Sequence, residues 1–252
     1  MIKVIINGIC GRMGREILRL AGESDDIGVV YGVDTGDPKG LEIPVSDSFN
    51  GAPGCDCVVD FSFHTATSCA LDYALKNRVP IVIGTTGHDE PEKAKIKEAA
   101  KTIPVFYASN YSIGIALLAE LAKRTAASLP GAEIEIVETH HDRKADAPSG
   151  TAVSLAEAIR ETRPEMFVKS GRSGFGARDK NEIGINSVRI GNVVGKHEII
   201  ISTPSQTLTL THEAHSRAVF AEGALVAVRF ITGGMGPGVY GMSDMLGKAE
   251  TV

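Results

Sequence analysis

The feature of this sequence that most constrains its fold is a glycine-rich turn between an apolar strand and a helix near the N-terminus. Ile2 to Ile6 is a nearly continuous apolar run, as expected of a strand buried on both faces of a parallel sheet. It leads into G-I-C-G-R-M-G at Gly8 to Gly14, and a helical pattern continues to Leu20. Glycines placed in this way let the backbone approach a pyrophosphate at the helix N-terminus. The stretch therefore predicts a dinucleotide-binding unit.

An acidic residue stands where such a fold contacts the adenosine ribose. The next predicted strand, Val29 to Val33, ends at Asp34, 20 residues past Gly14. A carboxylate there accepts hydrogen bonds from the ribose hydroxyls of NADH. Because a 2′-phosphate would meet like charge, Asp34 favours NADH over NADPH. The spacing G-x-x-G-x-x-G differs from the commoner G-x-G-x-x-G, so the alternative is a plain turn with a surface aspartate.

Strands and helices keep alternating up to about residue 111. The further elements expected are strands Val58 to Asp60, Ile81 to Ile83 and Val105 to Ala108, and helices Thr65 to Lys76 and Glu90 to Lys101. Repeated βα units predict an α/β fold with a Rossmann-like, doubly wound parallel sheet. Glycine, threonine and asparagine follow two strand ends, at Gly84 to Thr86 and Ser109 to Asn110, where such sheets bind ligands.

The pattern changes after residue 111. A helix is expected over Ile113 to Ser128, as a connection between the halves, followed by strands around one further helix, Thr151 to Glu161. The expected strands are Glu133 to Glu138, Ile183 to Arg189, His197 to Thr203 and Thr207 to Thr211. This predicts three segments: residues 1–111 as the dinucleotide-binding domain, 112–216 as a smaller α+β domain for substrate and oligomerisation, and 217–252 packing back on the first domain.

Chemically versatile residues converge between Glu138 and Ala152. The stretch E-T-H-H-D-R-K-A-D-A-P-S-G-T-A holds two adjacent histidines and a lysine just before a helix start. Ser149 is a natural N-cap, and the amides of the following residues favour a carboxylate or phosphate. The stretch thus predicts a loop that binds an anion beside groups able to move protons. The alternatives are an ordinary cap with incidental histidines, or a metal site, which neighbouring strand residues disfavour because they cannot easily share one ion.

Composition narrows the class of protein. The chain has 252 residues and a net charge of −5, which argues against a nucleic-acid binder. No apolar run approaches the roughly 20 residues of a membrane span, and the opening run is too short for a signal peptide. The 4 cysteines lack C-x-x-C spacing and indicate reduced thiols in the cytoplasm.

With both halves in view, the whole chain resembles the 4-hydroxy-tetrahydrodipicolinate reductases, also called dihydrodipicolinate reductases. Its most specific match is H-H-D-R-K-A-D-A-P-S-G-T-A from His140 to Ala152. The other matching motifs are the glycine-rich Gly8 to Gly14, D-F-S at Asp60 to Ser62, G-T-T-G at Gly84 to Gly87, A-S-N-Y-S at Ala108 to Ser112, T-H-E-A-H-S-R at Thr211 to Arg217 and G-V-Y-G-M-S-D-M-L at Gly238 to Leu246.

The resemblance implies an NAD(P)H-dependent reduction of a small cyclic dicarboxylate in diaminopimelate and lysine synthesis, by a homotetramer. It implies His140 as the acid/base residue and Lys144 as the proton donor. The implied substrate contacts are His141, Ser149, Gly150 and Thr151. The implied cofactor contacts are Gly8, Ile9, Cys10, Gly11, Arg12, Met13, Asp34, Gly84, Thr85, Thr86, Ala108, Ser109, Asn110 and Tyr111.

Two departures from the family pattern bear on the cofactor. Thr35, directly after Asp34, and Phe63 stand at two positions where some other members carry basic residues. Arg12 and Lys39 remain as cations able to reach a 2′-phosphate. NADH is therefore the expected preference, with NADPH tolerated. The rival interpretations are a Rossmann reductase of another small oxo- or imino-acid and a nucleotide-binding module without turnover.

Overall fold

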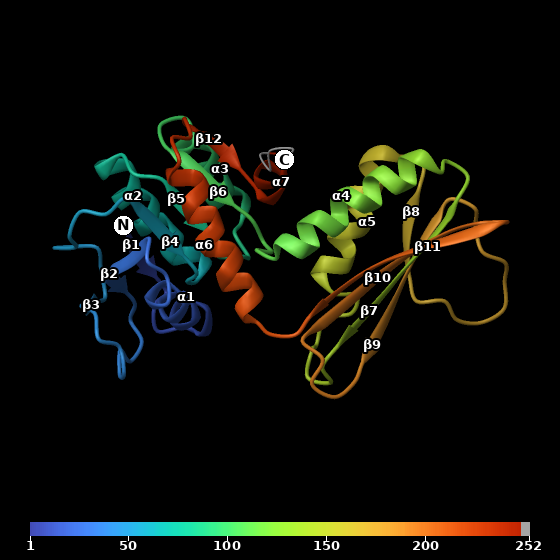
Figure 1. Cartoon of the computed structure of the whole chain (residues 1–252), viewed down its shortest axis with the longest axis horizontal. Helices are drawn as coiled ribbons and strands as arrows, with labels where there is room; N and C mark the ends of the chain where they lie inside the picture. Colours follow the sequence, from blue (N-terminus) through green and yellow to red (C-terminus); the bar gives the residue numbers. More distant parts are fainter. Residues whose placement is uncertain (248–252) are drawn as a thin grey trace. The chain divides into compact units, whose positions relative to one another are not determined.

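The computed structural model describes residues 1–247 and divides the chain into two compact units (Figure 1). One unit comprises Met1–Ser112 together with the segment from Ala218 onward, and the other is Ile113–Arg217. These divisions fall within one residue of the boundaries expected from the sequence.

The first unit is built on a seven-stranded sheet with the order β12-β6-β5-β4-β1-β2-β3. Every neighbouring pair is parallel. The strands are β1 (Ile2–Asn7), β2 (Ile27–Val33), β3 (Val45–Ser46), β4 (Cys57–Asp60), β5 (Ile81–Ile83), β6 (Pro104–Tyr107) and β12 (Gly238–Tyr240). From β1 the chain adds β2 and β3 on one side, then crosses over to add β4 on the other side of β1. The strand order therefore reverses at β1. Such a reversal is where doubly wound sheets bind ligands.

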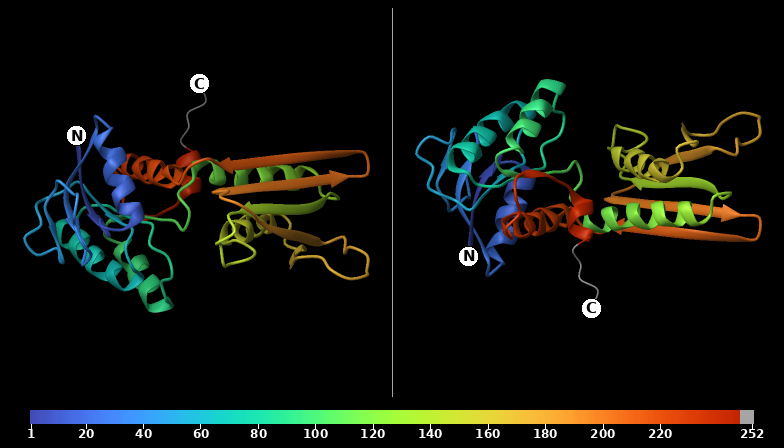
Figure 2. Two further views of the ribbon diagram at one scale, coloured as in Figure 1. Left: turned by 90° about the horizontal axis from the view of Figure 1, so that it is seen from below. Right: turned by 90° about the horizontal axis from the view of Figure 1, so that it is seen from above.

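Helices cover both faces of this sheet (Figure 2). On one face, α1 (Arg12–Gly22) and α6 (Ala218–Thr232) share a core with alternate residues of the central strands. On the other, α2 (Thr67–Asn77), preceded by the 3₁₀ turn His64–Ala66, packs with α3 (Glu90–Ala99). The central strands are mostly apolar, as expected for strands buried on both faces, and the predicted doubly wound α/β sheet is confirmed.

The segment from Ala218 completes the first unit. Helix α6 buries residues in the core of that unit, and β12 pairs with β6 at the sheet edge. A short helix, α7 (Met242–Leu246), follows. The sequence pattern did not predict β12, because this strand has only three residues in a glycine-rich segment, too few to show an alternation of polar and apolar side chains. The last part of the predicted C-terminal segment, residues 248–252, lies outside the described residues.

The second unit contains a mixed five-stranded sheet with the order β11-β10-β7-β9-β8. Strand β10 is antiparallel to both neighbours, whereas β9 is parallel to β7 and β8. The strands are β7 (Glu133–His140), β8 (Phe167–Ser170), β9 (Glu182–Arg189), β10 (Gly195–Thr203) and β11 (Gln206–Ala214). The short β8 was not expected from the sequence.

Two helices, α4 (Ile113–Ser128) and α5 (Gly150–Thr162), pack on the same face of this sheet (Figures 1 and 2). Their buried residues share one core with Ile134, Ile136 and the alternate isoleucines of β9 and β10. Two expectations are corrected here. The sequence suggested one helix in the strand-rich region and treated Ile113 to Ser128 as a connection. In the structure α4 belongs to this core, to which it contributes Ile115, Leu118, Ala122 and Ala126.

The strand β7 is longer than expected, and this matters for the site. The sequence pattern predicted that this strand ends at Glu138 and that His140 lies in the following loop. In the structure the strand continues through His140. Its continuation is explained by pairing, since Thr139 lies opposite Lys196 of β10 and Val188 of β9. The helix expected to reach Lys101 ends at Ala99.

Candidate active site

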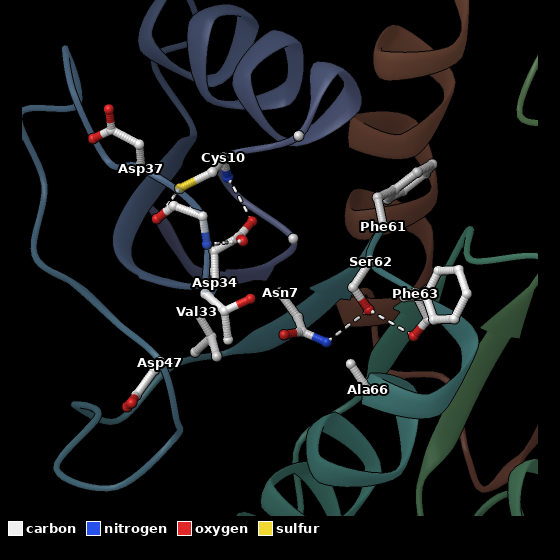
Figure 3. Close-up of a pocket in the computed structure, with 14 residues that line it drawn as sticks. Asn7, Cys10, Val33, Asp34, Asp37, Asp47, Phe61, Ser62, Phe63 and Ala66 are labelled. Atoms are coloured by element: carbon white, nitrogen blue, oxygen red, sulfur yellow. Dashed lines mark hydrogen bonds between the residues drawn. The ribbon is translucent and has the colours of Figure 1, made fainter.

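A cavity of about 610 Å³ opens at the strand-order reversal of the first unit (Figure 3). Its lining comes from the carboxyl ends of β1, β2 and β4, the loops that follow them, and Asp47 just after β3. Three carboxylates line it, those of Asp34, Asp37 and Asp47, whereas no lysine or arginine of residues 1–247 does. Arg12, predicted to lie in the glycine-rich turn, is instead the first residue of α1, and neither it nor Lys39 lines the cavity.

The glycine-rich turn is closely packed against its surroundings. Gly8 has a φ of +85°, and a Cβ there would lie 2.3 Å from the carbonyl oxygen of Phe61. A Cβ on Gly14 would lie 2.2 Å from the carbonyl oxygen of Gly8. Only glycine fits both positions, so the first turn of α1, with its unpaired amides, is held against the end of β1.

Asp34 connects this turn to the loop after β2. Its Oδ2 accepts a hydrogen bond from the Cys10 N–H at 2.8 Å, and its Oδ1 accepts one from the Gly36 N–H at 2.8 Å. Arg15 of α1 reinforces the connection by donating to the carbonyl oxygens of Cys10, Asp37 and Lys39. The carboxylate is thereby fixed at the mouth of the cavity before any ligand arrives.

Other predicted cofactor residues divide into exposed and buried groups. The side chains of Ile9 and Tyr111 lie in the core, with 0% and 2% of their surface exposed, so only their backbone is available to a ligand. The Tyr111 hydroxyl donates to the carbonyl oxygen of Ile83 at 2.8 Å. Gly84 is required by packing, because a Cβ there would lie 2.2 Å from the ring of Phe61. Thr85 Oγ1 accepts from the Ser62 N–H at 2.9 Å.

In the second unit, the predicted proton-handling and anion-binding residues gather where β7 ends and α5 begins. The predicted cap is confirmed, since Ser149 Oγ accepts the Ala152 N–H at 3.2 Å. Lys144 Nζ donates to the Asp146 carboxylate at 2.8 Å, and that carboxylate also accepts a backbone hydrogen bond from Gly150. His141 Nε2 accepts from Arg217 at 3.5 Å.

Beneath this surface lies a buried carboxylate that sequence reasoning missed. Glu138 has 0% of its surface exposed, and His140 Nδ1 lies 2.5 Å from its Oε2. Arg189 of β9 donates to both of its oxygens, and the Ser149 N–H donates to Oε1 at 3.1 Å. Although burial opposes ionisation, these bonds and one from Ser187 lower the Glu138 pKa to about 2.

A second buried histidine completes the cluster. His197 of β10 is 4% exposed, its Nε2 lies 3.3 Å from Ser149 Oγ, and its ring stands edge-on to that of His140 at 5.2 Å. Burial lowers the His197 pKa to about 4, so this imidazole is neutral at physiological pH. His197 Nε2 and the Ser149 hydroxyl share one hydrogen bond, in which the tautomer of the imidazole decides the donor. Both polar groups of Ser149 are therefore used inside the protein.

The sequence carried one signal for Glu138, namely that it precedes His140 by two residues on a strand, which puts both side chains on one face. For Arg189, His197 and Arg217 there was no such signal, because each lies about 50 or more residues away along the chain. Within residues 1–247 no group of three or more histidine, cysteine or acidic residues is arranged to hold a metal ion. None of the helices in the same range has the length and apolar character of a membrane span.

The parallel sheet, its reversal point and the carboxylate-lined cavity define the first unit as a Rossmann-type dinucleotide-binding fold of the kind found in oxidoreductases. Two family models cover almost the whole chain: "Dihydrodipicolinate reductase, N-terminus" matches residues 2–111 and "Dihydrodipicolinate reductase, C-terminus" matches residues 114–246. The chain belongs to the dihydrodipicolinate reductase family and is an oxidoreductase.

Individual relatives agree with this assignment over their full length. The chain is 43% identical to the 4-hydroxy-tetrahydrodipicolinate reductase of Caldanaerobacter subterraneus subsp. tengcongensis, covering 98% of this chain and 99% of that protein. It is 41% identical to the Akkermansia muciniphila enzyme of the same name, covering 99% and 100%. Its fold matches the dipicolinate-bound dihydrodipicolinate reductase from Paenisporosarcina sp. TG-14 with a TM-score of 0.83 and 28% identity, over 97% and 99% of the two chains.

Proposed function

We propose that the protein reduces 4-hydroxy-tetrahydrodipicolinate to tetrahydrodipicolinate with NAD(P)H, in diaminopimelate and lysine biosynthesis. The observation that supports this proposal most directly is that Lys144 and His140 lie beside the capped N-terminus of α5. The relatives of this chain bear the name of this reaction. We assign cofactor binding to the first unit and substrate binding to the second.

The residues around the cavity of the first unit fit a dinucleotide. A carboxylate fixed by Cys10 and Gly36 suits ribose hydroxyls, and a glycine-packed helix start suits a pyrophosphate. When bound, the reduced nicotinamide supplies the hydride. The residues that we propose to hold the cofactor are Gly8, Cys10, Gly11, Arg12, Met13, Asp34, Gly84, Thr85, Thr86, Ala108, Ser109 and Asn110, with Ile9 and Tyr111 contributing backbone only.

We further propose that NADH is preferred. Asp34, Asp37 and Asp47 surround the space where an adenosine ribose would lie. A 2′-phosphate placed a few ångströms from one such carboxylate costs on the order of 1–4 kcal/mol, depending on the effective dielectric. No lysine or arginine of residues 1–247 lines this cavity, so nothing within the lining itself offsets the repulsion.

For the substrate, we propose that one carboxylate binds at the N-terminus of α5. The amides of Gly150 and Thr151 and the Lys144 ammonium provide donors of the right kind, and we propose His141 as a further substrate contact. Dipicolinate, bound in the related Paenisporosarcina structure, is a dicarboxylate of the same class. The Ser149 N–H donates to Glu138, and its hydroxyl is hydrogen-bonded to His197. We therefore assign Ser149 the role of helix cap and not that of a direct substrate contact.

The proton chemistry falls to Lys144 and His140. Once the 4-hydroxyl has left as water, hydride goes to C4 of the conjugated cyclic imine and negative charge develops toward the ring nitrogen. A nearby ammonium neutralises this charge and provides the proton. We propose Lys144 as that donor. His140 exchanges protons through Nε2, because its Nδ1 is directed to Glu138.

The proposal extends to assembly and location. In the second unit both helices pack on one face of the sheet, while Val137, Val188 and Ile200 lie on the opposite face. We propose that this face and the sheet edges form the interfaces of a homotetramer. All 4 cysteines are free, in accord with a reduced cytoplasmic enzyme.

The test is a coupled assay in which dihydrodipicolinate synthase supplies the unstable substrate, run with NADH and then with NADPH. Oxidation of the cofactor that depends on the synthase product supports the proposal. Turnover of 2-oxo acids in its place would point to another Rossmann reductase, and cofactor binding without turnover to a nucleotide-binding module.

A further inference from the structure

The carboxylate of Glu138 is buried and fully engaged. It has no exposed surface, yet it accepts hydrogen bonds from Arg189 Nη1 at 2.8 Å, Arg189 Nη2 at 2.7 Å, His140 Nδ1 at 2.5 Å and the Ser149 N–H at 3.1 Å. Removing a carboxylate from water is costly unless it is paired and hydrogen-bonded. The bidentate guanidinium supplies the pairing, so the charge is stable at this position.

This one carboxylate contacts both halves of the proposed substrate site. Its Oε2 meets the imidazole of His140, and its Oε1 meets the cap residue of α5. Arg189 extends the connection to the loop between them by donating to the carbonyl oxygen of Asp146 at 2.6 Å. Strand β7, strand β9, the loop and the helix start are thus joined through a single buried ion pair.

The contact with His140 has a chemical consequence. An ionised carboxylate can only accept, so Nδ1 must carry the proton in the neutral imidazole. Nε2 is then the atom that takes up or releases a proton. A Cβ on Gly195 would lie 3.1 Å from Nε2, so the glycine keeps that side of the ring uncrowded.

We propose that Glu138, held by Arg189, is a positioning residue that fixes the tautomer and orientation of His140 and, through Ser149, the start of α5. The role rests on the function proposed above, because it concerns how that site is assembled. Glu138 has no exposed surface and therefore acts only through its neighbours.

Glu138→Gln is the direct test, because it keeps the shape of the side chain but replaces one acceptor oxygen with a donor. We expect kcat to fall by roughly 10- to 1,000-fold with a smaller rise in KM, since proton transfer suffers more than ground-state binding. NADH affinity should stay unchanged. In ¹⁵N NMR of the imidazole, wild-type His140 should carry its proton on Nδ1 at neutral pH, and the variant should lose that single tautomer.

The pH dependence provides an independent readout. The charged groups around His140 are Glu138, Lys144 and Arg189, with His197 packed against its ring. Burial lowers the His140 pKa and Glu138 opposes that effect, so removing the carboxylate should lower the pKa further. The NMR titration of His140 should therefore move to lower pH in Glu138→Gln.

Two companion variants keep the test decisive. Glu182→Gln removes another buried carboxylate paired with an arginine, Arg172 at 2.7 Å, at the far end of β9, and should preserve kcat and the His140 tautomer. Should Glu138→Gln misfold, the double variant Glu138→Gln with Arg189→Met removes both charges and should fold.

A wild-type kcat and an unchanged Nδ1-protonated tautomer in either Glu138 variant would overturn the proposal. If the wild type does not turn over the substrate, the proposed function fails. The tautomer measurement then still decides the role of Glu138, because it needs no substrate.

Discussion

The ammonium of Lys144 lies 2.8 Å from the carboxylate of Asp146, two residues further along the same loop. The same carboxylate accepts a backbone hydrogen bond from Gly150 at the start of α5. Asp146 therefore occupies two of the donors that we propose for a substrate carboxylate, Lys144 and the Gly150 amide. A substrate has to compete with it.

The first prediction concerns this competition. Asp146→Asn should bind dipicolinate about two- to fivefold more tightly, because losing an exposed ion pair releases up to about 1 kcal/mol. Isothermal titration calorimetry measures the change. Asp142→Asn is the matched control, since Asp142 is paired with Arg143 in the same loop and should have no effect. Weaker binding by the Asp146 variant would show that Asp146 orients Lys144 and does not compete.

The second prediction concerns the proton donor. Lys144→Ala should lower kcat by roughly 10²–10⁴-fold while NADH affinity barely changes, because the developing charge loses its neutralising group. His140→Ala should lower kcat as well. Steady-state kinetics and NADH titration measure both effects. Arg143→Ala serves as the control, because its exposed side chain contacts Asp142 and Asn192. A near-normal kcat in Lys144→Ala would remove the assignment.

The third prediction concerns cofactor choice. We expect the wild type to prefer NADH about tenfold in kcat/KM, because the cavity is lined by carboxylates. Combining Asp34→Ser with Thr35→Arg should move the ratio toward NADPH. Both cofactors should bind less tightly overall, since the Cys10 and Gly36 amides lose their acceptor. A wild type that already prefers NADPH would contradict the role given to Asp34.

The fourth prediction concerns assembly. Light scattering at micromolar concentration should give four times the mass of one chain. Ile200→Lys, on the sheet face opposite the helices, should reduce that mass because a buried ammonium would lie in the interface. Lys101→Ala, at an exposed position of the first unit, is the comparison and should leave the mass unchanged. A wild-type monomer would exclude the tetramer and leave the site untouched.

The fifth prediction concerns stability against pH. Folded His197 stays neutral down to a pKa of about 4, whereas an unfolded histidine takes up its proton near 6.5. The unfolded state thus binds more protons between these values. The free energy of unfolding should fall by up to about 3 kcal/mol as the pH drops from about 6.5 to 4.

Urea denaturation at a series of pH values measures this dependence. His197→Gln should flatten it, and the exposed His215→Gln should leave it intact. The Glu138 carboxylate acts in a lower window, since its folded pKa of about 2 lies below the ordinary value of 4.5, and its stabilisation is lost progressively as the pH falls from about 4.5 to 2. A variant His197→Gln with the wild-type slope would contradict the prediction.

The features that the sequence determined are those encoded by near neighbours. The turn at Gly8 to Gly14, the strand ending at Asp34 and the cap at Ser149 each depend on residues a few positions apart. Spacing and side-chain type suffice there, because the hydrogen bonds and steric limits involved are local. The same reasoning located Lys144 and both adjacent histidines.

Only the tertiary structure decided which distant residues meet. Arg189 and His197 reach Glu138 and Ser149 because β9 and β10 flank β7 in a particular register, with Arg189 opposite His140 and His197 opposite Glu138. Strand β12 of the C-terminal segment pairs with β6, which lies more than a hundred residues earlier in the chain. Strand pairing over such separations is fixed by the burial of a whole core, which no local pattern records.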